Sequence, residues 1–171
     1  MQDINESIKT IAGFMQIAAT TAPKTRGINN IITKILKDDE VIKLADDMIN
    51  TGKKTQRPHT FQRDSDSIRS CTCIFIAGTL KKSLGLDCSF CGYSDCRHAD
   101  QNSILCSYNS CDLGIAIGSA VATANRFHID NRIMYTIGYT AVRTNIFDEQ
   151  VSMALGVPLS ATGKNPFFDR R

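Results

Sequence analysis

The sequence predicts one α+β (or α/β) domain with a three-layer core and a cysteine-rich metal-binding insert. Its 171 residues are 42% hydrophobic, which is enough to bury a sizeable core within a single domain, 1–171. Segments with helical and with strand periodicity alternate along the chain, as is typical of helices layered on a sheet. Five of the seven cysteines fall within residues 84–111, and these residues form the predicted metal-binding loop.

The spacing of apolar side chains assigns the individual elements. Apolar residues that recur every three or four positions indicate a helix, whereas runs rich in Ile, Val and Thr suit a strand. Proline and glycine mark where an element ends. These criteria predict helices over residues 7–19, 38–52 and 139–146, a helix from Ser110 or Asp112 to about Phe127, and strands over residues 28–36, 71–80, 132–138 and 151–159.

Two stretches are interpreted as structural. Residues 51–66 are polar throughout, so we expect an exposed connection in which His59 lies at the surface. In the strand over residues 71–80, Cys71 and Cys73 share one face with Phe75. Both thiols are interpreted as small hydrophobic side chains of a buried strand, since cysteines two apart in a strand are badly placed for an unstrained disulfide.

The charge pattern excludes several classes of partner. The net charge is +3, spread along the chain without a basic run, and the absence of Trp leaves few rings for stacking on bases. We therefore expect no nucleic-acid partner. Asp3, Glu6 and Lys9 interrupt the N-terminal apolar residues, which argues against a signal peptide and a membrane span. A thiol-rich loop without an export signal predicts a cytoplasmic protein.

The cysteine loop carries the chemistry. Cys88, Cys91 and Cys96 follow the pattern C-x2-C-G-x3-C, and the two-residue gap lets one tight turn aim two thiolates at the same centre. A fourth ligand comes later, at Cys106 or Cys111, and the closing loops permit either. Thiolates select zinc, cuprous ion or iron–sulfur clusters. Three closely spaced cysteines followed by a distant fourth are typical of four-iron clusters, whereas structural zinc usually takes two closely spaced pairs of Cys or His ligands. The sequence therefore favours an iron–sulfur cluster, with zinc as the alternative metal.

The cysteine motif and several longer blocks resemble known families. CSFCGY resembles the four-cysteine iron–sulfur domain of corrinoid iron–sulfur proteins and of some membrane electron-transfer subunits. Together with AATTAPKTRGINNI, DLGIAIGSAV, DNRIMYTIG and GVPLSATGKNPFFDR, it resembles a prokaryotic family of uncharacterised proteins containing a ferredoxin domain. This resemblance implies a 4Fe-4S cluster on Cys88, Cys91 and Cys96. It also favours Cys106 over Cys111, because the family's last cysteine likewise precedes its DLGIA block by six residues.

A more remote resemblance is to the FMN-dependent nitroreductase fold. AATTAPKTRG resembles that fold's basic phosphate-binding segment, and ALGVPLSATGK resembles its closing strand and basic tail. This resemblance implies an FMN phosphate site built from Lys24, Arg26 and Lys164, although Lys24 and Arg26 also suit a solvated helix exit. It further implies a homodimer, to whose contact the small residues of the helix that ends near Phe127 would contribute.

The predicted function is that of an iron–sulfur redox protein. Two forms of it stay open: an electron carrier with a redox partner protein, and an oxidoreductase in which the cluster passes electrons, with flavin as a second cofactor. A zinc-stabilised interaction domain without redox activity is the alternative. No paired carboxylates or Ser/His/Asp set points to hydrolysis.

Overall fold

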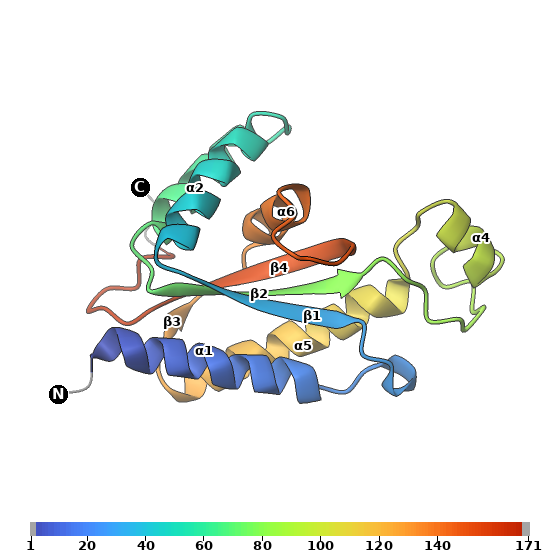
Figure 1. The fold of residues 1–171 in the computed structure, drawn as a ribbon, viewed down its shortest axis with the longest axis horizontal. Helices are drawn as coiled ribbons and strands as arrows, with labels where there is room; N and C mark the ends of the chain where they lie inside the picture. The colour runs from blue at the N-terminus through green and yellow to red at the C-terminus, as the bar shows by residue number, and fades with distance from the viewer. Residues whose placement is uncertain (1–2, 169–171) are drawn as a thin grey trace.

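The fold is built on one antiparallel sheet, in a computed structural model that describes residues 3–168. The end of the last motif block, Asp169 and Arg170, lies outside the described residues. The sheet has four strands in the order β1-β2-β4-β3, all antiparallel to their neighbours. These are β1 (Ile31–Lys37), β2 (Cys73–Leu80), β3 (Asp130–Asn131) and β4 (Val151–Ser160) (Figure 1).

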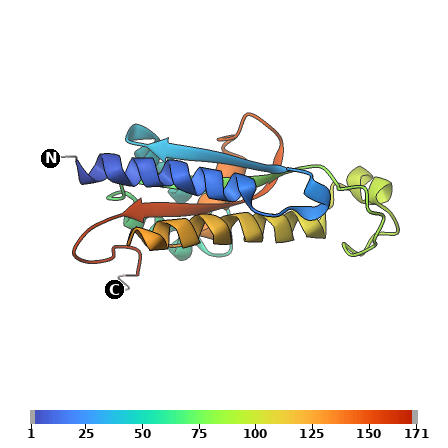
Figure 2. The same cartoon turned by 90° about the horizontal axis from the view of Figure 1, so that it is seen from below.

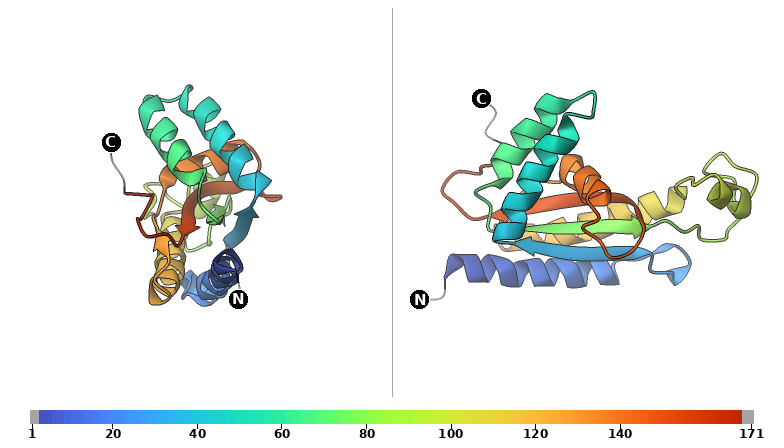
Figure 3. Two further views of the ribbon diagram at one scale, coloured as in Figure 1. Left: turned by 90° about the vertical axis from the view of Figure 1, so that its left-hand side faces the viewer. Right: turned by 45° about the horizontal axis from the view of Figure 1, so that its top comes forward.

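Helices cover both faces of the sheet and make three layers. On one face α1 (Ile4–Thr21) and α5 (Ser107–Arg126) lie side by side (Figure 2). The other face carries α2 (Asp39–Gly52), α3 (Pro58–Ile68) and α6 (Tyr135–Arg143) (Figure 3). The short elements η1 (Thr25–Gly27) and α4 (Cys96–Gln101) lie beyond one end of the sheet. The predicted α+β architecture with a three-layer core is confirmed.

The central strand β2 separates two hydrophobic cores. Successive side chains of a strand point to opposite faces, so Cys73 and Phe75 pack with α1 and α5, while Ile74 and Ile76 pack with α2, α3 and α6. All four side chains are 0% exposed. A strand buried on both faces reads as a continuous apolar run, which is why the sequence identified it.

The close approach of α6 to β4 requires glycine. A Cβ atom added to Gly138 would overlap the carbonyl of Ala154, and one added to Gly156 would overlap the Ile137 side chain. Any larger residue at either position would therefore separate the helix from the strand.

The predicted polar connection over residues 51–66 is wrong, because much of it is the helix α3. Phe61 and Ile68 are buried on its inner side. Asp64 and Ser65 also face inward, and each has a partner in another helix: the Thr136 hydroxyl donates to Asp64 Oδ2 at 2.7 Å, and the Ser65 hydroxyl donates to the Ala45 carbonyl at 2.8 Å. These long-range hydrogen bonds make the polar inner positions compatible with burial.

Three smaller expectations also need correction. Helix α6 replaces the short strand predicted over residues 132–138 and begins four residues before the predicted helix at 139. Cys71 precedes β2 and packs against the core on the α2 face, so it does not share a face with Cys73. Helix α5 begins at Ser107, ahead of both predicted caps. In the part of the chain described, no helix is long and apolar enough to span a membrane.

Candidate metal-binding site

The cysteine loop joins the end of β2 to the start of α5 and projects past the end of the sheet (Figure 1). Its elements of regular structure are few, and α4 is a single short helix within it. Two apolar side chains, Leu84 and Ala99, anchor it inward and are each 3% exposed. Most of the other loop side chains are exposed or half-buried, so hydrogen bonds rather than apolar packing determine its shape.

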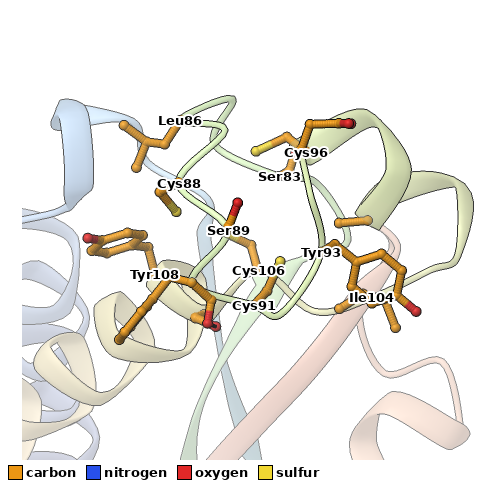
Figure 4. A pocket seen from close by; sticks show the side chains of 14 residues that line it. Ser83, Leu86, Cys88, Ser89, Cys91, Tyr93, Cys96, Ile104, Cys106 and Tyr108 are labelled. Carbon is orange, nitrogen blue, oxygen red and sulfur yellow. Dashed lines mark hydrogen bonds between the residues drawn. The ribbon is translucent and has the colours of Figure 1, made fainter.

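Four cysteines of this loop line one pocket. They are Cys88, Cys91, Cys96 and Cys106, the four residues predicted as ligands (Figure 4). Cys88 is exposed and the other three are half-buried. Cys111 is exposed on α5 and does not belong to the pocket lining. Among residues 3–168, no three His, Cys, Asp or Glu side chains converge closely enough to hold a metal ion, so the four thiols share a pocket without forming a closed coordination sphere.

A tight turn places Cys88 and Cys91 at the pocket. Ser89 and Gly92 have left-handed backbone angles, with φ of 56° and 87°. The Gly92 amide donates to the Ser89 carbonyl at 2.9 Å and closes the turn. Glycine tolerates a positive φ without steric cost, which suits Gly92 to this position. Phe90 lies at the tip between the two cysteines and is 66% exposed.

Cys96 is held by a reciprocal pair of hydrogen bonds with Asp87. Its amide donates to Asp87 Oδ1 at 2.8 Å, and the Asp87 amide donates to the Cys96 sulfur at 3.3 Å. Cys96 is also the first residue of α4, which Asp95 caps by accepting the His98 amide at 2.8 Å. This backbone hydrogen bond, followed by one from the Ser94 side chain, lowers the pKa of Asp95.

Contacts with the start of α5 position Cys106. The Ser107 hydroxyl donates to the Phe90 carbonyl at 3.3 Å, and the rings of Phe90 and Tyr108 lie 5.6 Å apart. Asn109, which is 1% exposed, donates to the Lys82 carbonyl at 2.6 Å. The first turn of α5 therefore contacts both the entry of the loop and the turn between Cys88 and Cys91.

The three cations predicted for a flavin phosphate do not come together in one chain. Lys24 and Arg26 precede β1, near the end of β2, whereas Lys164 follows β4, whose last residues pair with the beginning of β2 (Figure 1). Because β2 spans eight residues, these sites lie roughly 25 Å apart along the sheet. A single site built from all three residues would require a second copy of the chain.

The Lys24 ammonium group already has acceptors within α1 and its exit. It donates to the carbonyls of Ala19, Thr20 and Ala22 at 2.9, 2.8 and 2.7 Å. A lysine at this position satisfies the last carbonyls of a helix and interacts favourably with its dipole. Partial burial lowers the pKa of Lys24.

The remaining two cysteines are thiols of the protein core. Burial raises the pKa of Cys71 to about 12 and that of Cys73 to about 11. Both are therefore protonated and unreactive near neutral pH, since the thiolate is the nucleophile and the metal ligand. This agrees with their interpretation as small hydrophobic side chains.

Sequence comparison places the chain in a family. It is 37% identical to an uncharacterised protein of Archaeoglobus fulgidus over 97% of this chain and 93% of that one. Residues 102–170 match the family described as "uncharacterized protein containing a ferredoxin domain" (DUF2148). The chain belongs to this family. The part of the chain that matches this family includes Cys106 and begins after Cys88, Cys91 and Cys96.

Structural comparison gives the fold of the chain. A nitroreductase with bound FMN from Desulfitobacterium hafniense is 12% identical, with a TM-score of 0.63 over 91% of this chain and 78% of that chain. A putative nitroreductase in complex with FMN from Desulfovibrio desulfuricans is 11% identical, with a TM-score of 0.59 over 95% and 79%. NfnB of Mycobacterium smegmatis, in complex with NADPH, is 10% identical, with a TM-score of 0.59 over 91% and 78%. At these identities the likeness establishes a nitroreductase-like fold.

Several residues that organise the site escaped the sequence analysis. Thr25 contacts Asp112, and Arg26 contacts the backbone of residues 84 and 85. Asn30 donates to Asn109 Oδ1 at 3.2 Å, and both asparagines are buried. These partners are 58 to 87 residues apart in sequence, so no local pattern could have paired them. The sequence interpretation of the Thr-Arg-Gly stretch rests on its charge and on its resemblance to a phosphate-binding segment, neither of which indicates these contacts.

Proposed function

We propose that this protein is a cytoplasmic iron–sulfur redox protein whose loop binds a 4Fe-4S cluster through Cys88, Cys91, Cys96 and Cys106. The observation that carries the proposal is that these four thiols line one pocket. The family's ferredoxin-domain description supports it. The donor set fits the group, since four-iron clusters are held by four cysteine thiolates. When bound, such a cluster accepts and releases single electrons. The cytoplasmic assignment follows from the accessible thiols, which suit a reducing compartment.

The position of Cys111 supports Cys106 as the fourth ligand. Cys106 precedes the first residue of α5 and turns into the pocket, whereas Cys111 lies more than one helical turn further along. The residue next to it, Asp112, is buried against Thr25, and Cys111 itself is exposed. Using Cys111 as a ligand would require α5 to rotate and would break the Thr25–Asp112 contact.

The surrounding residues would adjust the electron-transfer properties. The Asp87 amide directed at the Cys96 sulfur stabilises negative charge on that sulfur, which raises a cluster's reduction potential. Tyr93 and Tyr108 are half-buried, line the same pocket and limit the access of water on their side of it. Cys88 and Phe90 leave one side of the pocket exposed, where a redox partner protein could approach.

Anaerobic reconstitution tests the proposal. The purified chain, supplied with ferrous ion and sulfide under strictly anaerobic conditions, is expected to bind about four irons and four sulfides per chain. It should become brown and give an electron paramagnetic resonance signal when reduced. A colourless protein that binds one zinc ion with the same four cysteines would contradict the proposal and establish the zinc-stabilised interaction domain instead.

We further propose that two copies associate through the exposed face of α1 and α5. Four large apolar side chains are exposed there: Phe14 (45%), Ile17 (60%), Ile115 (46%) and Phe127 (49%). Cβ atoms added to Gly114 and Gly118 on α5 would meet nothing within 4 Å, so the helix surface is open to close approach. Sedimentation of the parent chain should give a dimer, and Ile115→Glu should give a monomer with unchanged unfolding. A monomeric parent chain would disprove this association.

The proposal includes a flavin site only if it is formed between two copies of the chain. The neighbouring nitroreductases bind FMN, and a site containing Lys24, Arg26 and Lys164 would have to combine residues of two copies. FMN would add hydride chemistry to the single-electron chemistry of a cluster and make the protein an oxidoreductase rather than a carrier.

A further inference from the structure

The turn η1 contacts both ends of the cysteine loop. It lies between α1 and β1 and consists of Thr25, Arg26 and Gly27. One of its residues bonds to α5 just after the loop ends, and the next bonds to the backbone where the loop begins. Figure 1 shows this turn at the end of the sheet from which the loop projects.

The contact after the loop is a buried carboxylate that accepts three hydrogen bonds from two donors of Thr25. Asp112 is 3% exposed, and the Thr25 amide donates to its Oδ1 and Oδ2 at 3.1 and 3.0 Å. The Thr25 hydroxyl donates to Oδ1 at 2.9 Å. Hydrogen bonds to an ionised acceptor are about twice as strong as neutral ones. They connect α5, six residues after Cys106, to the η1 turn.

The contact at the beginning of the loop comes from a residue in an unusual backbone conformation. Arg26 has φ 59° and ψ 11°, in the left-handed region that non-glycine residues rarely adopt. Its Nη1 donates to the Leu84 carbonyl at 2.7 Å and to the Gly85 carbonyl at 3.3 Å. Gly85 is itself left-handed, with φ 64°. An unfavourable backbone conformation persists where surrounding contacts compensate for it, and here the guanidinium contacts do so.

We propose that Arg26 and the Thr25–Asp112 pair form a clasp that preorganises the cysteine loop for its metal. A flexible loop of this length must lose conformational freedom before four thiols can meet at one centre. Fixing both ends of the loop to one rigid turn reduces that cost and makes the metal site easier to form and slower to lose. For the metal site Arg26 is a positioning residue, because its guanidinium group bonds to the loop backbone and not to a cysteine. The inference rests on the proposed cluster for its metal-dependent part.

The test compares Arg26→Asn with Lys24→Ala. Asparagine tolerates the left-handed conformation, so Arg26→Asn removes the guanidinium group without adding backbone strain. Lys24→Ala removes an equal charge two residues away, where the ammonium group bonds to α1 and not to the loop. Arg26→Lys should lie between Arg26→Asn and the parent chain in both measurements, because an ammonium group can reach one carbonyl but lacks the planar fork of arginine.

Two measurements are made on each variant. In metal-free protein, tryptic cleavage after Arg97, within α4, should be about tenfold faster for Arg26→Asn than for the parent, at an unchanged melting temperature. In reconstituted protein, loss of iron to an excess of chelator should also be about tenfold faster. Lys24→Ala should match the parent in both. The cleavage measurement needs no metal, so it tests the clasp independently of the cluster. A parent chain that binds no iron would disprove the cluster but not the clasp.

Parent-like cleavage and parent-like iron loss in Arg26→Asn would each overturn the clasp. Faster iron loss together with a lower melting temperature of Arg26→Asn would also overturn it. Arg26 would then stabilise the whole domain rather than the loop.

Discussion

The sheet core and the cysteine loop are held together by different forces. In the core, the side chains of β2 from Cys73 to Ala77 are fully buried between two layers of helices, and close packing determines their positions. In the loop, apolar anchors are few. The carboxylates of Asp87 and Asp95 accept backbone amides, Asn109 donates to the Lys82 carbonyl, and these hydrogen bonds determine the backbone. The comparison implies that the core folds without a cofactor, whereas a bound metal would be needed to draw the four thiols of the loop together.

The largest effect should come from filling the closest contact of the core. Gly138→Ala puts a Cβ into the Ala154 backbone, so we expect the free energy of unfolding to fall by about 3 kcal/mol or more. Gly13→Ala is the matched control, because nothing lies within 4 Å of its Cβ and alanine should stabilise α1 by roughly 0.5–1 kcal/mol. Urea unfolding of metal-free protein measures both. Equal effects of the two substitutions would mean that α6 and β4 are not packed as described.

The loop should respond in the opposite way, with loss of metal and no loss of fold. Cys106→Ser removes the ligand next to α5, and we expect iron binding to be abolished while the unfolding midpoint of metal-free protein stays unchanged. Cys111→Ser should retain the full iron content, because Cys111 does not line the pocket. Iron and sulfide analysis after reconstitution separates the two variants. The reverse pattern would identify Cys111 as the ligand.

The sequence predicts the core better than the loop, because apolar packing leaves a local pattern in the sequence and long-range hydrogen bonds do not. The strands β2 and β4 and the helices α1, α2 and α5 were predicted because apolar periodicity is a local property of the core. Helix α3 was missed because Asp64 and Ser65 occupy inward positions and are satisfied by residues distant in sequence. In the loop, the cysteine spacing singled out Cys88, Cys91 and Cys96, and the family resemblance favoured Cys106 over Cys111. The contacts of Thr25 and Arg26 come from chain reversals that no spacing reveals.

The cysteines of the two regions should also differ in pH dependence. Burial raises the pKa of Cys71 to about 12 and of Cys73 to about 11, above the usual value of 9.0. The folded protein then binds more protons than the unfolded chain above pH 9, so these thiols make stability fall as the pH rises from about 9, with no effect at neutral pH. At pH 8, iodoacetamide should modify Cys88 and Cys111 of metal-free protein long before Cys71 and Cys73. Rapid labelling of Cys73 in folded protein would contradict its burial.

The smallest effect we expect is on FMN binding, at a site that neither the core nor the loop forms alone. If two copies complete an FMN phosphate site, Lys164→Ala should weaken FMN binding about tenfold, which corresponds to the loss of one charge-assisted contact. Lys24→Ala should change it less than about twofold, since the Lys24 ammonium group already donates to three backbone carbonyls. Fluorescence quenching during titration of the dimer measures both affinities. Absence of saturable quenching in the parent chain would exclude FMN at this site. A tenfold loss in Lys24→Ala would instead show that FMN draws the lysine away from the end of α1, so that the helix exit and the phosphate site compete for the same charge.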